Sequence, residues 1–425
     1  MRLKSYENIG EQVLSQTLPN GLQVYVIPKP GYSKAYAFFA TNYGGVDRRF
    51  RLGGKWIDTP EGVAHFLEHK MFDMPGGNAL MELSANGASP NAFTSGDITA
   101  YHFQCTEKFY ENLRTLLTFV STPYFTDESV DKEQGIIGQE IRMGDDDADR
   151  AVYYNMMKCL YESHPLRYSV AGTVESISEI TAKTLYDCHK VFYNPSNMVL
   201  CVEGDVDPDK VIDMCLEILP REPGEVPVRD YGDDETKGLK PYMERLECDM
   251  AISRPLFFIG CKTSPVPRGR DFLARNVAAG IALDVLLGDS SKLYNDLYAS
   301  GLIGGDFGAA FETVAGSACT IVGGQSDDPE RVFDRVRETV ADAAKNGVDE
   351  ALFQRVKKAT YGGLLRRLNS FDAVCYDYSY GYFNGYDEFT TAKVLEDATM
   401  EQVMQFIKTD LSPENMAISR VNPKG

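Results

Sequence analysis

The stretch GVAHFLEHKMF, residues 62–72, contains two of the five histidines in a chain of 425 residues. His65 and His69 lie four positions apart, with Glu68 between them. On a helix, positions three and four apart are neighbours, so the three side chains share one face. Two imidazoles one turn apart suit a tetrahedral zinc ion, and a glutamate beside them can take a proton from an attacking water. The alternative is a pair of core histidines beside an unrelated glutamate. We favour the metal because so few histidines are available to form the pattern by accident.

The residues just before this stretch predict that it is helical. Thr59 is suited to the N-cap, Pro60 to the first helical position and Glu61 to the first turn. The two histidines are therefore expected on a helix that begins near Thr59.

A third metal ligand is expected to be a carboxylate, because the remaining histidines are poor candidates. They are His102 in a strand-like segment, His164 before a proline and His189 in a mixed helix.

Residues 130–143, VDKEQGIIGQEIRM, offer two carboxylates with helical spacing. Glu133 and Glu140 are seven residues apart and share a stripe with Ile136 and Ile137. Glutamate is rarely buried without a partner, and a divalent metal would be one. An ordinary surface helix is the alternative. Spacing leaves open which glutamate would bind the metal and which would support a ligand.

Composition narrows the function. With 43% apolar and 25% charged residues, the chain is typical of a globular protein of two or three domains. A net charge of -19 argues against a nucleic-acid or anionic-membrane partner. No secretory signal and no run of about 20 apolar residues is evident, so we expect a cytoplasmic protein. The nine cysteines are scattered and include no CxxC pair, which favours buried reduced thiols.

The order of predicted elements indicates an α+β fold in two similar halves. Strands are expected at 22–27 and 34–44, and a hairpin is expected about residues 95–97. The stretch 221–242 is rich in proline, glycine and charge. We take residues 222–245 as a linker between an N-terminal metal-binding domain, 1–221, and a C-terminal domain, 246–425. Strands and helices then recur in a similar rhythm, which indicates a diverged duplication.

With these motifs in view, the chain resembles the pitrilysin and insulinase family of zinc peptidases, M16, which includes the mitochondrial processing peptidase. HFLEH at 65–69 is the inverted zinc motif, and EQGIIGQE at 133–140 matches the family's glutamate helix. Other matching segments are TLPNGLQVYVIP, NAFTSGDITAYHF, AGTVESISEIT and FYNPSNMVLCVEGDVDP. The likeness covers almost all of the first half and only the layout of the second, and it is greatest to the short bacterial type.

The resemblance implies one zinc ion per chain, with Glu140 as third ligand, Glu133 as its support and Glu68 as the catalytic base. It implies two homologous α/β sandwich domains that form half of a clam shell around a peptide chamber. An extended peptide would add to the edge strand containing NAFTSGDITAYHF. Asn91 matches a position that contacts the peptide backbone, and Ala92 and Phe93 follow it there. For Asn91 the alternative is a residue that forms the turn before a strand.

One family feature is missing. Active members carry an arginine and a tyrosine on a second-half helix, which stabilise the oxyanion. In SSKLYNDLYASGLIGGDF, residues 290–307, these positions fall on Tyr298 and near Gly304. Tyr294 and Tyr298 could substitute, although packing is the simpler explanation for tyrosines one turn apart.

We therefore expect the zinc-bearing catalytic subunit of a heterodimeric metalloendopeptidase, with a role in peptide processing or maturation. Its homologous partner would lack the zinc motif and supply the arginine and tyrosine. The alternatives are a self-sufficient homodimer, a scaffold with a structural zinc and a hydrolase of non-peptide amides. Glu68 argues against the scaffold, since a structural zinc needs no base.

Overall fold

The computed structural model describes residues 1–265 and 268–424, apart from the side chains of residues 235 and 236. These residues form two compact units. Unit 1 comprises residues 1–141, 169–231 and 365–390, and unit 2 comprises the described residues of 142–168, 232–364 and 391–425. No helix among the described residues is long and apolar enough to cross a membrane.

Unit 1 is built on a seven-stranded sheet in the order β1-β2-β3-β11-β4-β10-β9. The parallel pair is β11 with β3, and the other neighbours are antiparallel. The strands are β1 (Arg2–Tyr6), β2 (Glu11–Thr17), β3 (Gln23–Pro28), β4 (Ala35–Thr41), β9 (Ser89–Thr94), β10 (Thr99–Cys105) and β11 (Met198–Gly204). All residues of β4 and β11 are buried, as expected for central strands covered on both faces.

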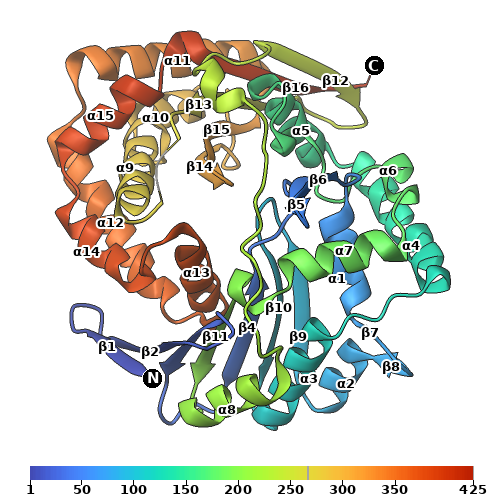
Figure 1. The fold of residues 1–425 in the computed structure, drawn as a ribbon. Helices are drawn as coiled ribbons and strands as arrows, with labels where there is room; N and C mark the ends of the chain where they lie inside the picture. The colour runs from blue at the N-terminus through green and yellow to red at the C-terminus, as the bar shows by residue number, and fades with distance from the viewer. Residues whose placement is uncertain (266–267, 425) are drawn as a thin grey trace. The chain divides into compact units, whose positions relative to one another are not determined.

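Helices cover both faces of this sheet (Figure 1). One face packs against a large apolar cluster that includes residues of α1, α3, α4, α7 and α8, while α13 packs on the other face. These helices are α1 (Val63–Met71), α3 (Phe109–Ser121), α4 (Asp127–Asp145), α7 (Ala182–Phe192), α8 (Pro208–Ile218) and α13 (Phe371–Asn384). Smaller elements of the first half are α2 (Ala79–Ala85), α6 (Val174–Ser178) and the two-stranded pairs β5 (Arg49–Leu52) with β6 (Lys55–Asp58) and β7 (Asp73–Met74) with β8 (Gly77–Asn78).

Unit 2 repeats the central part of this plan with a five-stranded sheet, β12-β16-β13-β15-β14. The parallel pair is β12 with β16, which corresponds to β3 with β11 in unit 1, and the other neighbours are antiparallel. The strands are β12 (Arg245–Met250), β13 (Leu256–Thr263), β14 (Gly308–Val314), β15 (Ser317–Gln325) and β16 (Met416–Pro423). The helices are α5 (Ala148–Leu160), α9 (Arg270–Leu287), α10 (Lys292–Ala299), α11 (Pro329–Asn346), α12 (Glu350–Arg367), α14 (Thr391–Asp397) and α15 (Met400–Asp410).

The two halves of the sequence correspond element by element in chain order. The order β3, β4, α1, α2, β9, β10, α3, α4, α5, α6, α7, β11 matches β12, β13, α9, α10, β14, β15, α11, α12, α13, α14, α15, β16. The two-unit α+β fold predicted from the sequence is thus confirmed, and the shared order supports a duplication.

Each half of the sequence contributes one helix to the other half's unit. Helix α5 packs on β13 and β16 of unit 2, whereas its counterpart α13 packs on β11 and β4 of unit 1. The compact units therefore do not coincide with the predicted halves 1–221 and 246–425. Those boundaries remain a prediction about the order of the chain.

The start of the helix that carries His65 and His69 was predicted wrongly. Helix α1 begins at Val63, and its N-cap is Gly62 with φ 91°. Both the amide and the hydroxyl of Thr59 donate to the carbonyl of Arg48, at 2.9 and 3.1 Å, so Thr59 closes the β5–β6 segment instead of capping a helix. A Cβ on Gly62 would lie 2.5 Å from the Ala171 carbonyl oxygen, so both space and backbone angle require glycine here.

Other local predictions are confirmed. The expected strands appear as β3 and β4, and the β9–β10 turn is closed by the Ser95 amide donating to the Ile98 carbonyl at 2.8 Å. All nine cysteines are free, and all but Cys248 are buried.

Candidate metal centre

Helix α1 presents the histidines because its other face is apolar. Val63, Phe66, Leu67 and Met71 are buried in the core of unit 1. The remaining stripe therefore faces away from the apolar cluster. His65 and His69 lie on it, and their side chains are 13% and 26% exposed.

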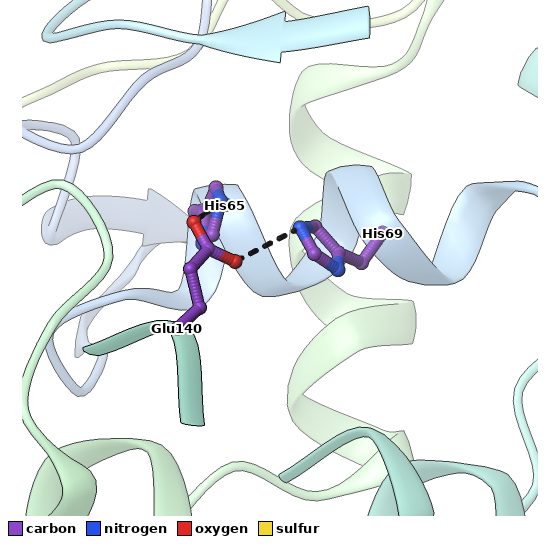
Figure 2. Close-up of side chains that lie close together, drawn as sticks. All are labelled: His65, His69 and Glu140. Atoms are coloured by element: carbon purple, nitrogen blue, oxygen red, sulfur yellow. Dashed lines mark ion pairs between the residues drawn. The ribbon is translucent and has the colours of Figure 1, made fainter. Parts of the chain in front are cut away.

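Helix α4 brings Glu140 to these rings. Its Oε1 lies 3.5 Å from His65 Nε2 and its Oε2 lies 3.6 Å from His69 Nε2. Figure 2 shows the Glu140 carboxylate facing both rings of α1. One ligand atom from each of the three residues can be chosen so that all lie within 4.8 Å of one another. Among the described residues, no other set of histidine, cysteine and carboxylate groups meets this criterion.

The spacing of these atoms fits zinc. Metal–ligand bonds of about 2.0–2.2 Å in a tetrahedral site place neighbouring ligand atoms about 3.3–3.6 Å apart. The two contacts of Glu140 lie in that range. Two imidazole nitrogens and one carboxylate oxygen are also a common donor set of a catalytic zinc site, which leaves the fourth position open.

Glu133 holds the other side of the His69 ring. Its Oε1 lies 3.1 Å from His69 Nδ1. If Nδ1 donates to this carboxylate, the lone pair of the neutral ring is on Nε2, which is the nitrogen that faces Glu140. The geometry thus separates the two glutamates of α4, which their spacing alone did not.

Carboxylates also shape the titration of His69 in the metal-free protein. Burial lowers the pKa of His69, but the hydrogen bond to Glu133 and the charges of Glu68, Glu133 and Glu140 outweigh burial and raise it above 6.5. Burial raises the pKa of Glu133, and the hydrogen bond with His69 is the main opposing effect, so the net pKa is lowered. This cluster favours positive charge, which either a proton or a metal ion supplies.

Glu68 lies on the buried side of the cluster, with 7% of its surface exposed. Thr94 of β9 donates its hydroxyl to Glu68 Oε2 at 2.8 Å. Burial raises the pKa of Glu68, and the Glu140 charge adds to this effect, while Thr94 and His69 act against it. The net pKa is raised, which makes the carboxylate a better proton acceptor than an exposed glutamate.

The predicted peptide-binding residues lie on the edge of the sheet. Strand β9 is the last strand of its sheet and pairs with β10 on one side. Its side chains alternate, as in any strand. Ala92 packs toward the cluster that contains α1, whereas Phe93 packs against Phe38 and Tyr376 on the α13 side. Asn91 is exposed, and its Oδ1 accepts from the Ala92 amide at 2.9 Å.

The other histidines have separate roles. His102 Nδ1 lies 2.8 Å from the Tyr36 hydroxyl, and His189 Nε2 lies 3.0 Å from the Val120 carbonyl oxygen. His164 caps the short helix Pro165–Arg167.

The two tyrosines considered as substitutes for the missing oxyanion contacts lie in unit 2, and the rings of Tyr294 and Tyr298 stack with their centroids 6.0 Å apart.

Sequence reasoning missed two residues at the site. Thr94 falls in the segment recognised as the edge strand, and alternation from Ala92 would have placed it on the side of α1. Lys70 lies directly after His69 and before the apolar residues Met71 and Phe72, and this position was the available signal.

Fold and site together define an α+β protein with a candidate metal centre, and comparisons with known proteins specify the family. The model of the insulinase domain of peptidase family M16 matches residues 53–174, and that of the M16 peptidase inactive domain matches residues 179–360. A zinc protease of Bacillus subtilis, YmfH, named as uncharacterized, is 36% identical over 426 residues, which cover 99% of this chain and 98% of YmfH. The beta subunit of the mitochondrial-processing peptidase of Caenorhabditis elegans is 24% identical, over 86% of this chain and 79% of its own.

Solved structures agree. An M16-like peptidase from Alicyclobacillus acidocaldarius superimposes with a TM-score of 0.92 at 34% identity, covering 97% of this chain and 99% of that one. Pitrilysin shares the fold with a TM-score of 0.77 at 16% identity, and the match covers 99% of this chain and 46% of pitrilysin. The chain belongs to peptidase family M16, and it is of the short bacterial type.

Proposed function

We propose that this chain is a zinc-dependent endopeptidase that cleaves extended peptides. The observation that carries the proposal is the convergence of His65, His69 and Glu140 beside a buried Glu68. We assign the first three as ligands of one zinc ion per chain, Glu133 as the support of His69 and Glu68 as the base. Names of relatives such as YmfH support the peptidase class.

The residues of the chain divide the work as follows. When bound, zinc would supply a Lewis acid that polarises the scissile carbonyl. Thr94 holds Glu68 Oε2, which leaves Oε1 to accept the proton of the attacking water. The raised pKa of Glu68 suits this proton transfer and the return of the proton to the leaving amine nitrogen. The open edge of β9 would take the peptide as an added strand, with backbone contacts near Asn91, Ala92 and Phe93.

We further propose that the active form is a heterodimer located in the cytoplasm and used in peptide processing or maturation. The support for the heterodimer is that the sequence has Tyr298 where the family's arginine falls and Gly304 near the place of its tyrosine. A homologous partner chain without the zinc motif would supply both. The name of the mitochondrial relative, a beta subunit, is consistent with a paired assembly.

The test is digestion of a random peptide pool by the zinc-loaded protein, alone and with the homologous chain, with products read by mass spectrometry. Cleavage that requires zinc and Glu68 supports the peptidase. Intact peptides in both conditions, together with tightly held zinc, would favour the scaffold instead. Hydrolysis of small amides without peptide cleavage would favour a non-peptide hydrolase.

A further inference from the structure

Lys70 is a buried lysine at the edge of the candidate metal centre. It follows His69 directly, and its side chain is only 2% exposed. Lysine is almost never fully buried without a partner, because removing an ammonium group from water is costly. Negatively charged partners are therefore expected beside the Lys70 ammonium group.

Two carboxylates flank this ammonium group. Lys70 Nζ forms an ion pair with Asp73, and it lies 3.8 Å from Glu133 Oε2. The other oxygen of Glu133 faces His69 Nδ1 at 3.1 Å. Asp73, Lys70, Glu133 and His69 thus form one continuous polar row that ends at a candidate ligand.

We propose that Lys70 is a positioning residue that holds Glu133 against His69 and so orients this ring for the metal. The inference rests on the zinc site of the proposed function. With the ammonium 3.8 Å from Oε2, its charge attracts the carboxylate of Glu133 from one side while Oε1 lies against Nδ1. Residues that hold a metal-binding histidine in this way typically change metal affinity about 10- to 100-fold when they are mutated.

A purely structural role explains Lys70 less well. Apolar residues in place of Lys70 and its carboxylate partners together would avoid the desolvation cost, and such replacement of a whole buried ion pair is often neutral for stability. What apolar residues cannot do is place a positive charge between two carboxylates. The charge of Lys70 therefore serves the arrangement of Glu133 more than the packing of α1.

The experiment compares Lys70→Met, Glu133→Gln and their double variant by zinc affinity, measured through competition with a chromophoric chelator. Circular dichroism and thermal unfolding check the fold of each. The matched control is Lys132→Met, which removes an exposed positive charge next to Glu133 in sequence. We expect Lys70→Met to weaken zinc binding about 10-fold or more. The control should stay within about 2-fold of wild type.

The double variant separates positioning from general loosening. If Lys70 acts through Glu133, adding Lys70→Met to Glu133→Gln should weaken zinc binding by no more than about 2-fold. Fully additive losses, or a Lys70→Met protein with wild-type affinity, would overturn the proposal. Should Lys70→Met not fold, Lys70→Gln asks the same question with a neutral polar side chain, and unchanged affinity there would equally overturn it. A wild-type protein that binds no zinc would instead refute the proposed function.

Discussion

The sheets of unit 1 and unit 2 share five strands in the same order and with the corresponding parallel pair. The helices that come after the matching strands β4 and β13 nevertheless differ. In unit 1 this helix is α1, which has nine residues, with His65, Glu68 and His69 on one stripe. In unit 2 it is α9, which has 18 residues and no histidine, and most of its length is buried. Within the described residues, the candidate metal cluster therefore belongs to unit 1.

This difference shows that the fold supplies a frame and that a few side chains supply the chemistry. Two helices must each present a polar stripe to the same point. Helices α1 and α4 do so with histidines and glutamates, whereas their counterparts α9 and α12 offer no histidine at all. The following experiments test whether activity follows the residues of unit 1 or the shared frame.

Removal of a metal ligand should have the largest effect. His65→Ala and Glu140→Gln are expected to lose the zinc, about one equivalent in the wild type, and with it all peptide cleavage. Metal analysis of purified proteins measures this. The control is His102→Gln, which changes a histidine of strand β10 outside the candidate metal cluster and should keep its zinc. Full zinc in Glu140→Gln would transfer the ligand role to Glu133.

Loss of the proposed base comes next. Glu68→Gln should keep zinc and fold but lose about 100- to 10,000-fold in turnover, because a proton acceptor is removed with little change in volume. The matched control is Glu312→Gln in unit 2. Glu312 is also a glutamate whose pKa is raised by burial, and it accepts a hydrogen bond from the Tyr153 hydroxyl at 3.0 Å. Near wild-type turnover in Glu68→Gln, or an equal loss in both variants, would contradict the assignment.

The partner should account for a somewhat smaller factor. If Tyr298 and Gly304 mark missing oxyanion contacts, the isolated chain should cleave a quenched fluorescent peptide slowly. A homologous chain that bears the arginine and tyrosine should raise turnover about 100- to 1,000-fold and form a one-to-one complex. Turnover and particle size are measured on each chain and on the mixture. Full activity from a homodimer would instead direct attention to Tyr294, Tyr298 or an arginine of the second half.

Gly62 at the start of α1 and Gly280 within its counterpart α9 should respond to substitution with opposite signs. Gly62→Ala should destabilise the protein by about 1–3 kcal/mol, because its φ is positive and the new methyl group would meet the Ala171 carbonyl oxygen. In α9, Gly280 has open space around its position, so Gly280→Ala should stabilise by about 0.5–1 kcal/mol. Denaturant unfolding measures both. Equal responses would mean that the start of α1 is not held as described.

The pH dependence of zinc binding should be the mildest effect. A proton on His69 competes with the metal, and the metal-free pKa of His69 is raised above 6.5. Zinc affinity should therefore begin to fall above pH 6.5 as the pH is lowered, by about 10-fold per unit once the ring is protonated. In Glu133→Gln the fall should begin at lower pH, because a stabilising carboxylate is gone. His102, whose pKa burial lowers to about 4, shows the opposite case. Chelator competition across pH tests the shift.

The sequence by itself determined the features that depend on local periodicity. Helical spacing placed His65, Glu68 and His69 on one stripe and Glu133 and Glu140 on another, because one turn of helix covers three to four residues wherever the helix lies. Strand alternation and turn residues likewise located the β9–β10 hairpin. The sequence also showed that Tyr298 and Gly304 stand where the family's arginine and tyrosine are expected.

Only the tertiary structure decided what depends on contacts between distant segments. It placed the Glu140 oxygens against Nε2 of His65 and of His69, and it placed Glu133 against Nδ1 of His69. The sequence could not separate these two roles, because both glutamates lie on the same stripe of one helix. In the folded protein the Thr59 hydroxyl donates to the Arg48 carbonyl, so Gly62 and not Thr59 is the N-cap of α1. The tertiary structure also exchanged α5 and α13 between the units, because a helix packs on whichever apolar face it can cover, and amphipathic spacing does not say which sheet that is.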